Sequence, residues 1–287
     1  MRASVWVLLL LAPGADATAP PKWTESDFKA LVDTCIGSSG SGYLAAAAKL
    51  DDSRESGRAI TDLTLNGKTW EERMTARILR ARRAYPWHVP GRPRPYTTGI
   101  AAIKRAKPPE RRPGEGEVPA LNASHQLPYP RPHCIESHKR QLGRRLFGGV
   151  VVCVEFLWKH KETTQAQRLY AVKCLVRGSS LQYWQAMGYD LKNTHPYIKY
   201  DRWYFHDLGE VLMHVLKQEE DAYVARELQR VLVMIPDERV LERVRQQAAS
   251  KDLAESVRQR FAEVVPLMEQ YLNRLKAKSS GTTQPTR

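Results

Sequence analysis

The stretch LFGGVVVCVEFLW at residues 146–158 decides which fold the sequence predicts. β-Branched and aromatic residues of this kind are enriched in strands, so we expect a strand here. A second stretch of the same character, LYAVKCLV at residues 169–176, follows after a polar run at residues 160–167. This order favours an antiparallel hairpin. Both faces of the two strands are mainly apolar, which predicts that other elements cover the hairpin on both sides.

Helical patterns lie on either side of this hairpin. Near the N-terminus, Thr24 is expected to cap a helix that Gly37 ends, and residues 43–50 form a short Ala-rich helix. Thr69 and Glu72 have the spacing of a capping box, which predicts a helix to about Arg82.

Three further helices are expected after the hairpin. Asp207 is placed to cap a helix over residues 208–234, which Pro236 breaks. The next helix covers residues 237–247, and Ser250 is expected to cap a last helix to about residue 276, with a kink at Pro266.

The predicted fold class is therefore α+β: a small N-terminal helical unit, a basic Pro-rich linker, and a small antiparallel sheet packed on C-terminal helices. The predicted boundaries are 1–17 for a signal peptide, 18–83 for the helical unit, 84–133 for the linker, 134–278 for the α+β domain and 279–287 for a disordered tail.

The charge of the chain is concentrated in one segment. The 287 residues carry a formal net charge of +14, with 45 Lys and Arg against 31 Asp and Glu. Residues 66–145 alone hold 18 of the basic and 6 of the acidic side chains, together with eleven prolines. Such a segment cannot bury enough apolar area to form a core, so we expect an exposed arm that attracts anions. The side chains of this arm that we expect to bind a polyanion are Arg92, Arg94, Lys104, Arg105, Lys107, Arg111 and Arg112.

The first 17 residues have the order of a secretory signal peptide. One Arg is followed by the apolar run VWVLLLLA at residues 5–12 and by the small-x-small triplet Ala15-Asp16-Ala17, after which cleavage is expected. The alternative is a mitochondrial import peptide, although those are Arg-rich and amphipathic. No apolar run approaches the roughly 18 residues of a membrane span.

Two sequence features agree with secretion or with residence in the lumen of the endoplasmic reticulum or Golgi. Asn122 begins an Asn-Ala-Ser triplet, the acceptor pattern for N-glycosylation. Arg80, Arg82 and Arg83 have the R-x-R-R spacing that furin-type processing enzymes read. A basic end of a helix, which the helix dipole favours, has the same residues, so the two interpretations stay open.

The four cysteines are candidates for disulfides in an oxidising compartment. The expected hairpin register places Cys153 opposite Cys174, which leaves Cys35 to pair with Cys134. A pairing of Cys134 with Cys153 is equally consistent with the sequence, and four buried thiols would be ordinary in a reducing compartment.

No catalytic or metal motif stands out. There is no G-x-S-x-G, no P-loop and no G-x-G-x-x-G, so an enzyme is not favoured and no cofactor is expected. His133, Cys134 and His138 lack the paired spacing of a zinc site, so no metal site is predicted. His195, and His206 next to Asp207, are more typical of caps and core contacts than of acid–base catalysis.

An aromatic stripe interleaved with basic residues admits a ligand surface as well as core packing, which is the commoner reason for such a stripe. Its members are Trp184, Tyr189, Tyr197, Tyr200, Trp203, Tyr204 and Phe205, with Lys192, Lys199 and Arg202.

Together these patterns predict a secreted or luminal glycoprotein that acts as a ligand or surface-glycoprotein subunit. Its basic arm would engage a glycosaminoglycan, an anionic surface or an acidic protein partner. The first alternative is an organellar RNA-associated basic protein of the ribosomal type, for which nucleic acid would be the partner. The second alternative is a secretory-pathway enzyme without a recognisable motif.

Overall fold

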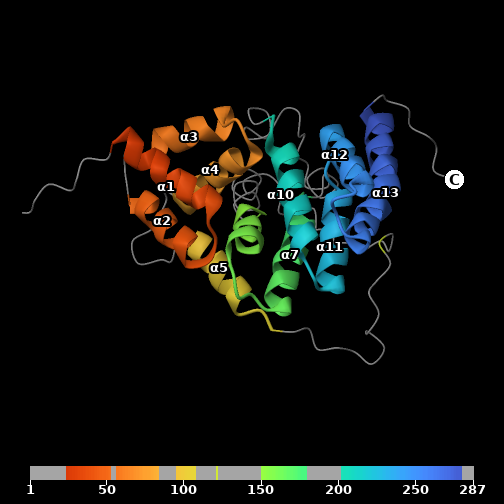
Figure 1. Cartoon of the computed structure of the whole chain (residues 1–287), viewed down its shortest axis with the longest axis horizontal. Helices are drawn as coiled ribbons and strands as arrows, with labels where there is room; N and C mark the ends of the chain where they lie inside the picture. The colour runs from red at the N-terminus through yellow and green to blue at the C-terminus, as the bar shows by residue number, and fades with distance from the viewer. Residues whose placement is uncertain are drawn as a thin grey trace, which may run out of the picture.

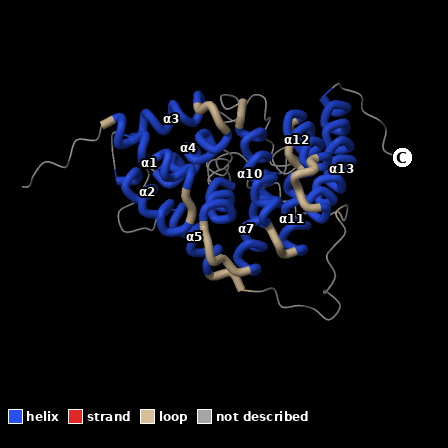
Figure 2. The backbone as a smooth tube through the Cα atoms, in the orientation of Figure 1, coloured by secondary structure: helices blue, strands red, loops and turns tan. Residues whose placement is uncertain are grey.

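The computed structural model describes residues 24–52, 56–83, 95–107, 121, 150–179 and 202–279, and within these ranges every element of regular structure is an α-helix (Figure 2). The predicted α+β class is therefore wrong. Residues 150–159 form a helix where the first strand was expected, and α7 (Gln165–Ser179) replaces the second strand.

Burial on all sides explains the error at residues 150–159. Val150 to Val154 and Phe156 are all buried, and so are the two charged residues, Glu155 and Lys159. A helix that is apolar all round is enclosed by other elements, and a short run of it has the same composition as a strand buried on both faces. The tertiary environment therefore overrode the β-propensity of the valines.

The spacing within α7 also differs from that of a strand. Leu169, Val172 and Leu175 are buried at intervals of three, whereas Tyr170 is 43% exposed and Lys173 is exposed. This is the period of one helix face rather than the alternation of a strand.

The first four helices pack in two pairs, α1 (Glu25–Gly37) with α2 (Gly40–Asp52), and α3 (Ser56–Asn66) with α4 (Trp70–Arg83). The predicted cap of α1 is confirmed, because the Thr24 hydroxyl accepts from the Asp27 amide and the Asp27 carboxylate accepts from the Thr24 amide. The Thr69–Glu72 capping box of α4 is confirmed in the same way.

A short helix, α5 (Pro95–Lys104), lies inside the predicted linker over residues 84–133. It packs against α7, and its Gly99 lies against Val152, whose Cγ1 would be only 3.1 Å from a Cβ at this glycine. A Cβ at this position would therefore be in tight contact with Val152. The remaining positions of the predicted linker lie outside the described residues, apart from 105–107 and 121.

The C-terminal part consists of α10 (Tyr204–Gln218), α11 (Ala222–Val233), α12 (Glu238–Ala249) and α13 (Glu255–Ser279). The single helix expected over residues 208–234 is two helices, because Asp221 accepts from the amides of Tyr223 and Val224 and caps α11. Asp207 does not cap the first of them, since α10 begins at Tyr204 and includes Asp207 in its first turn. The ends at Pro236 and Asp237 are as predicted, since Asp237 caps α12. Ser250 ends α12 instead of capping the last helix, and α13 includes Pro266.

One hydrophobic core joins these helices. It runs from Val32 in α1 to Leu272 in α13 and includes the buried residues of the helix over 150–159. Figure 1 shows α10 between the N-terminal helices and α11 to α13, and α10 contacts α4, α11 and α12. The two units predicted over residues 18–83 and 134–278 thus share one interior. Among the described helices, none has the length and apolar character that crossing a membrane requires.

Candidate functional site

A buried ion cluster joins α4 to α10 at the base of the candidate site. Arg73 donates to Asp207 through Nε (2.9 Å to Oδ2) and Nη2 (2.6 Å to Oδ1), and Arg77 donates through Nη1 (2.6 Å to Oδ2). The two arginines are four residues apart and therefore share one face of α4. Arg73 also donates to the carbonyls of Gly67 and Lys68, at 2.8 and 3.3 Å, which fixes the turn between α3 and α4.

Trp203, directly before α10, is surrounded by arginines. The guanidinium carbons of Arg73, Arg239 and Arg202 lie 4.5, 4.8 and 5.3 Å from the centre of its ring. Arg239 is itself held by Asp237 (2.6 Å), and it donates to the carbonyl of Arg202 (2.9 Å). Cation–π contacts of this kind fix the indole in one orientation.

His206 lies between two carboxylates on α10. Its Nδ1 is 3.1 Å from Oδ1 of Asp207, and its Nε2 is 3.8 Å from Oε1 of Glu210, which also accepts from Nε of Arg243 (2.8 Å). Burial raises the pKa of Asp207, but the hydrogen bonds from His206 and Arg73 outweigh it and hold this pKa below its usual value. Asp207 therefore stays a carboxylate.

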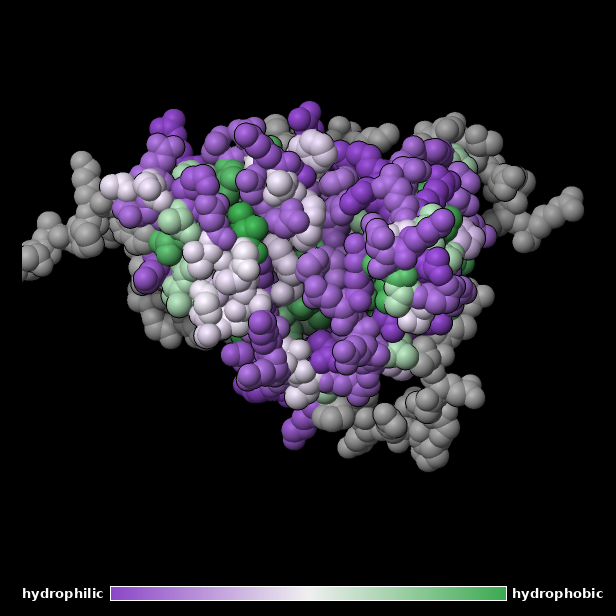
Figure 3. All heavy atoms as spheres, in the orientation of Figure 1, coloured by the Kyte–Doolittle hydropathy of each residue, from purple (hydrophilic) through white to green (hydrophobic). Residues whose placement is uncertain are grey.

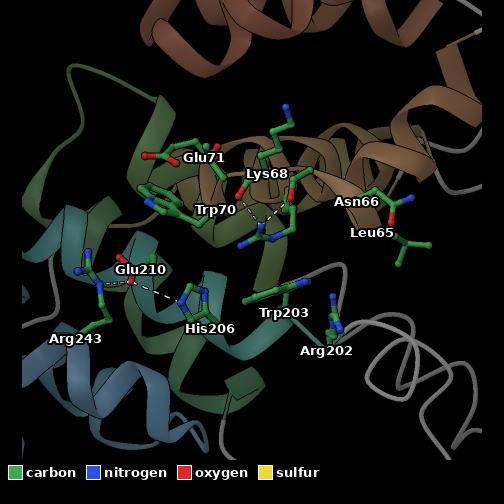
Figure 4. Close-up of a pocket in the computed structure, with 13 residues that line it drawn as sticks. Leu65, Asn66, Lys68, Trp70, Glu71, Arg202, Trp203, His206, Glu210 and Arg243 are labelled. Carbon is green, nitrogen blue, oxygen red and sulfur yellow. Dashed lines mark hydrogen bonds and ion pairs between the residues drawn. The ribbon is translucent and has the colours of Figure 1, made fainter.

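These side chains border a hollow of about 710 Å³, a volume that suits a small molecule or a few side chains of a partner (Figure 4). Figure 4 shows Trp70 and Glu71 toward one end and Asn66 and Arg202 toward the other. The remaining lining residues are Leu65, Gly67, Lys68, Thr69, Arg73, Trp203, His206, Glu210 and Arg243.

The cations of this hollow are of two kinds. Arg73 and Arg243 are bound to Asp207 and Glu210, and Asp207 is shared with Arg77. Lys68 and Arg202 are exposed, and neither forms an ion pair with any other residue that the structure describes. The hollow is therefore equipped to bind an anionic group at its rim.

A second polar cluster lies in the interior and belongs to the fold. The fully buried Glu155 accepts from the Tyr43 hydroxyl and from Nη1 of Arg82, both at 2.8 Å, and Arg82 also donates from Nε to Asp51 (2.9 Å). Burial raises the pKa of Glu155 to about 7, although Arg82 and Tyr43 act in the opposite direction. The cluster fastens the helix over 150–159 to α2 and α4.

Lys159 makes a similar link to the end of α1. Its Nζ donates to the carbonyls of Ile36 (2.8 Å) and Ser38 (3.2 Å) and lies 3.7 Å from the centre of the Trp158 ring. Burial lowers the pKa of Lys159 to about 8. Its role is to satisfy carbonyls that the end of α1 leaves without an intrahelical partner.

The structure describes only some of the residues predicted to bind a polyanion or to be processed. Lys104, Arg105 and Lys107 are exposed at the end of α5, whereas the other four arginines of that set fall outside the described residues. Arg80, Arg82 and Arg83 form the last turn of α4 and are half-buried, and Arg82 is bound to Glu155 and Asp51. The predicted signal peptide over residues 1–17 and the predicted glycosylation site Asn122 also lie outside the described ranges.

Three of the four cysteines are described, and all three are present as thiols. Cys153 and Cys174 lie on two helices and not on the two strands of a hairpin, and Cys174 together with burial raises the pKa of the Cys153 thiol. Cys35 is buried near Lys159, and Cys134 lies outside the described residues, so the pairing of these two stays a prediction.

The structure places the His206–Asp207 pair and part of the aromatic stripe at the hollow. Trp203 lines the hollow, whereas Tyr204 is buried in the core. His133, His138 and His195 lie outside the described residues, and no group of metal-binding side chains occurs within the ranges that are described.

Sequence reasoning did not find Lys68, Trp70, Glu210 or Arg243, because helices far apart in the chain bring them together. The local pattern that could have pointed to this site is the pair Arg73 and Arg77, because two arginines on one face of a helix among the buried residues Ala76 and Ile78 indicate a buried acidic partner. Comparison with known proteins adds no assignment, since no family model, curated protein or solved structure matches this chain.

Proposed function

We propose that this chain is a binding protein that engages a polyanion or an acidic partner through exposed basic side chains, in the secretory route to which residues 1–17 and Asn122 point. One observation carries the proposal. Among the described basic residues of the segment 66–145, the buried Arg73 and Arg77 and the half-buried Arg82 are held in ion pairs. Lys68, Lys104, Arg105 and Lys107 are exposed and form none with described residues. The charge that the fold does not use is therefore displayed on the surface.

The end of α5 holds three of these cations on a fixed backbone. Gln167 of α7 donates from Nε2 to the carbonyl of Lys104 (3.0 Å), and Arg105 donates from Nε to the carbonyl of Ala101 (3.2 Å). Burial is the main cause that lowers the pKa of His160 to about 4, and the charge of Lys104 adds to it, so this cation lies near the loop before α7. A pre-positioned cluster of this kind loses less conformational entropy when a ligand binds.

This surface favours binding by charge and not by apolar contact. The face in Figure 3 is mostly hydrophilic, with apolar side chains in small, separate areas. Among the described residues, the large apolar side chains that are exposed are Leu65 and Tyr170. Attraction between exposed charges weakens as salt rises, because the Debye length falls to about 8 Å at physiological ionic strength.

The direct test removes the three cations at and just after the end of α5. The test variant is Lys104→Gln, Arg105→Gln, Lys107→Gln. We expect it to bind immobilised heparin and poly-glutamate roughly tenfold more weakly in low salt, because each exposed ion pair with the ligand contributes up to about 1 kcal/mol to the binding free energy. The matched control is Lys49→Gln, Lys251→Gln, Arg274→Gln, which removes the same charge from exposed positions elsewhere. Equal losses in the two triple variants would reject a site at α5.

The RNA-associated alternative rests on the same cations and is separated by the same titration. If a single-stranded RNA of matched length binds much more tightly than heparin at equal salt, the organellar alternative is favoured. An N-terminus of the mature protein near Thr18 supports the secretory route, and an intact N-terminus contradicts it. For the enzyme alternative, the candidate acid–base pair at the hollow is His206 with Asp207. Both oxygens of Asp207 already accept hydrogen bonds from Arg73 and Arg77, which does not favour a catalytic role.

A further inference from the structure

We propose that the hollow between the α3–α4 turn and the start of α10 binds a segment of a partner protein in which a large apolar side chain stands next to acidic side chains. The apolar side chain packs against Leu65, and a carboxylate pairs with Arg202. This inference rests on the proposed function for the acidic character of the partner. It deepens that function by naming the chemistry of the bound segment, and it uses residues other than those of α5.

Leu65 is an exception to the mainly hydrophilic surface. It is 41% exposed, and among the described residues the other exposed large apolar side chain is that of Tyr170. Leu65 lines the hollow together with the indoles of Trp70 and Trp203. Burying exposed apolar area is favourable, and aromatic rings add dispersion contacts to it. The hollow therefore favours a ligand that brings an apolar side chain of its own.

Trp203 is held in one orientation before any ligand binds. The guanidinium carbons of Arg73 and Arg239 lie 4.5 and 4.8 Å from the centre of its ring, and ion pairs with Asp207 and Asp237 hold these two arginines. Side chains that are already fixed lose little conformational entropy on binding. Tryptophan and arginine are also enriched among the residues that dominate the binding energy of protein interfaces, which favours a protein segment as the occupant.

The cations that a ligand can pair with lie toward one end of the hollow. Figure 4 shows Arg202 toward the same end as Leu65, Glu71 toward the opposite end, and Lys68 between them. Arg202 and Lys68 are exposed, and neither forms an ion pair with a described residue. A carboxylate next to the bound apolar side chain is therefore placed at Arg202, and the flexible stem of Lys68 lets its ammonium approach the same group.

The acidic residues of the hollow do not suit an evenly charged polyanion. The carboxylates of Glu71 and Glu210 line it as well, so heparin or RNA that filled the hollow would place anionic groups beside them. Like charges that meet at an interface oppose binding. A peptide avoids this repulsion, because it can carry its carboxylates at the Arg202 end alone.

The experiment uses the full chain and a short synthetic peptide with one phenylalanine next to two glutamates in a glycine–serine background. Isothermal titration calorimetry in low salt measures the affinity. We expect Lys68→Gln, Arg202→Gln to bind the peptide about tenfold more weakly, and Leu65→Ser about threefold more weakly. The matched control Lys49→Gln, Lys251→Gln removes the same charge from exposed positions elsewhere, and it should change the affinity by less than about twofold.

Two altered peptides test the two parts of the ligand separately. Replacing the phenylalanine by glycine, or both glutamates by glutamines, must weaken binding to the wild-type chain. Glu71→Gln removes a carboxylate from the same hollow, so it must not weaken binding of the original peptide. Circular dichroism checks that each variant is helical.

Three results would overturn the proposal. These are equal losses in the Lys68–Arg202 and Lys49–Lys251 variants, equal affinity for the peptide without phenylalanine, and binding of free phenylacetate as tight as that of the peptide. The last result would assign the hollow to a small organic acid. The test at α5 measures heparin binding of a different variant, so a failure there and a failure here are distinguishable.

Discussion

The guanidinium of Arg82 and the carboxylate of Glu155 form a buried ion pair, with Nη1 2.8 Å from Oε1, that joins the last turn of α4 to the helix at residues 150–159. Glu155 is the central acceptor, since the Tyr43 hydroxyl donates to the same oxygen. A motif that suggested proteolytic processing in the sequence thus contributes a side chain to the interior of the folded protein.

Replacing Arg82 with Gln removes this cation and leaves Glu155 buried without it. Above the Glu155 pKa, at about pH 8, we expect the free energy of unfolding in urea to fall by about 3–5 kcal/mol, because a buried carboxylate then lacks its partner. The control is Arg245→Gln, which breaks exposed pairs with Glu242 and Glu269 and should cost about 1 kcal/mol or less. Adding Glu155→Gln to Arg82→Gln should recover part of the loss. Similar costs for the Arg82 and Arg245 variants would contradict a structural role for the buried pair.

The raised pKa of Glu155 gives this residue a pH-dependent contribution to stability. The folded state holds the proton up to about pH 7, whereas the unfolded chain releases it near 4.5, so the contribution of Glu155 falls as the pH rises between these values. The stability of the wild type relative to Glu155→Gln should therefore decrease by up to about 3 kcal/mol from pH 4.5 to 7.

The free energy of unfolding of the wild type must be compared with that of Glu155→Gln at each pH, because His160 changes the stability with pH in the opposite direction. Its pKa is lowered to about 4, so its contribution is lost as the pH falls from 6.5 toward 4. A difference between wild type and Glu155→Gln that stays constant over this range would show that Glu155 titrates normally.

Asp207 is predicted to be indispensable for the hollow and for the fold. Asp207→Asn leaves two buried guanidinium groups, those of Arg73 and Arg77, without a carboxylate. We expect a loss of about 3–5 kcal/mol in chemical unfolding. Asp237→Asn is the comparison, because asparagine is as good an N-cap as aspartate and the pair with Arg239 is half-exposed, so a loss of about 1 kcal/mol is expected. A loss no larger at position 207 would contradict the ion cluster.

Gly209 of α10 lies directly against Val240 of α12. A Cβ at this position would lie 2.5 Å from both Cγ atoms of Val240, so Gly209→Ala should destabilise the protein by about 1–3 kcal/mol. Gly57→Ala is the matched control, because nothing lies within 4 Å of its Cβ and alanine is the better helix former. Thermal unfolding measures both, and Val240→Ala combined with Gly209→Ala should be less destabilised than the sum of the two. A neutral Gly209→Ala would contradict the close contact.

Local signals in the sequence determined several helix ends. Thr24 with Asp27, and Thr69 with Glu72, cap their helices through bonds that span three residues, so no distant part of the chain is needed to predict them. Pro236 and Asp237 likewise mark the boundary between α11 and α12. The excess of basic residues in the segment 66–145 is also a property of the sequence alone.

Only the tertiary structure decided that residues 150–158 form a helix and that arginines of α4 are held in ion pairs of the interior. A short apolar run is compatible with a buried strand and with a buried helix, and the choice fell to the helices that surround it. In the sequence, Arg73 and Arg82 are cations of the same basic segment as the exposed Lys104. In the structure they form ion pairs with Asp207 and Glu155, which lie more than 70 residues away along the chain. Charge is readable from sequence, but whether a charge is compensated in the interior or displayed at the surface depends on contacts that form only on folding.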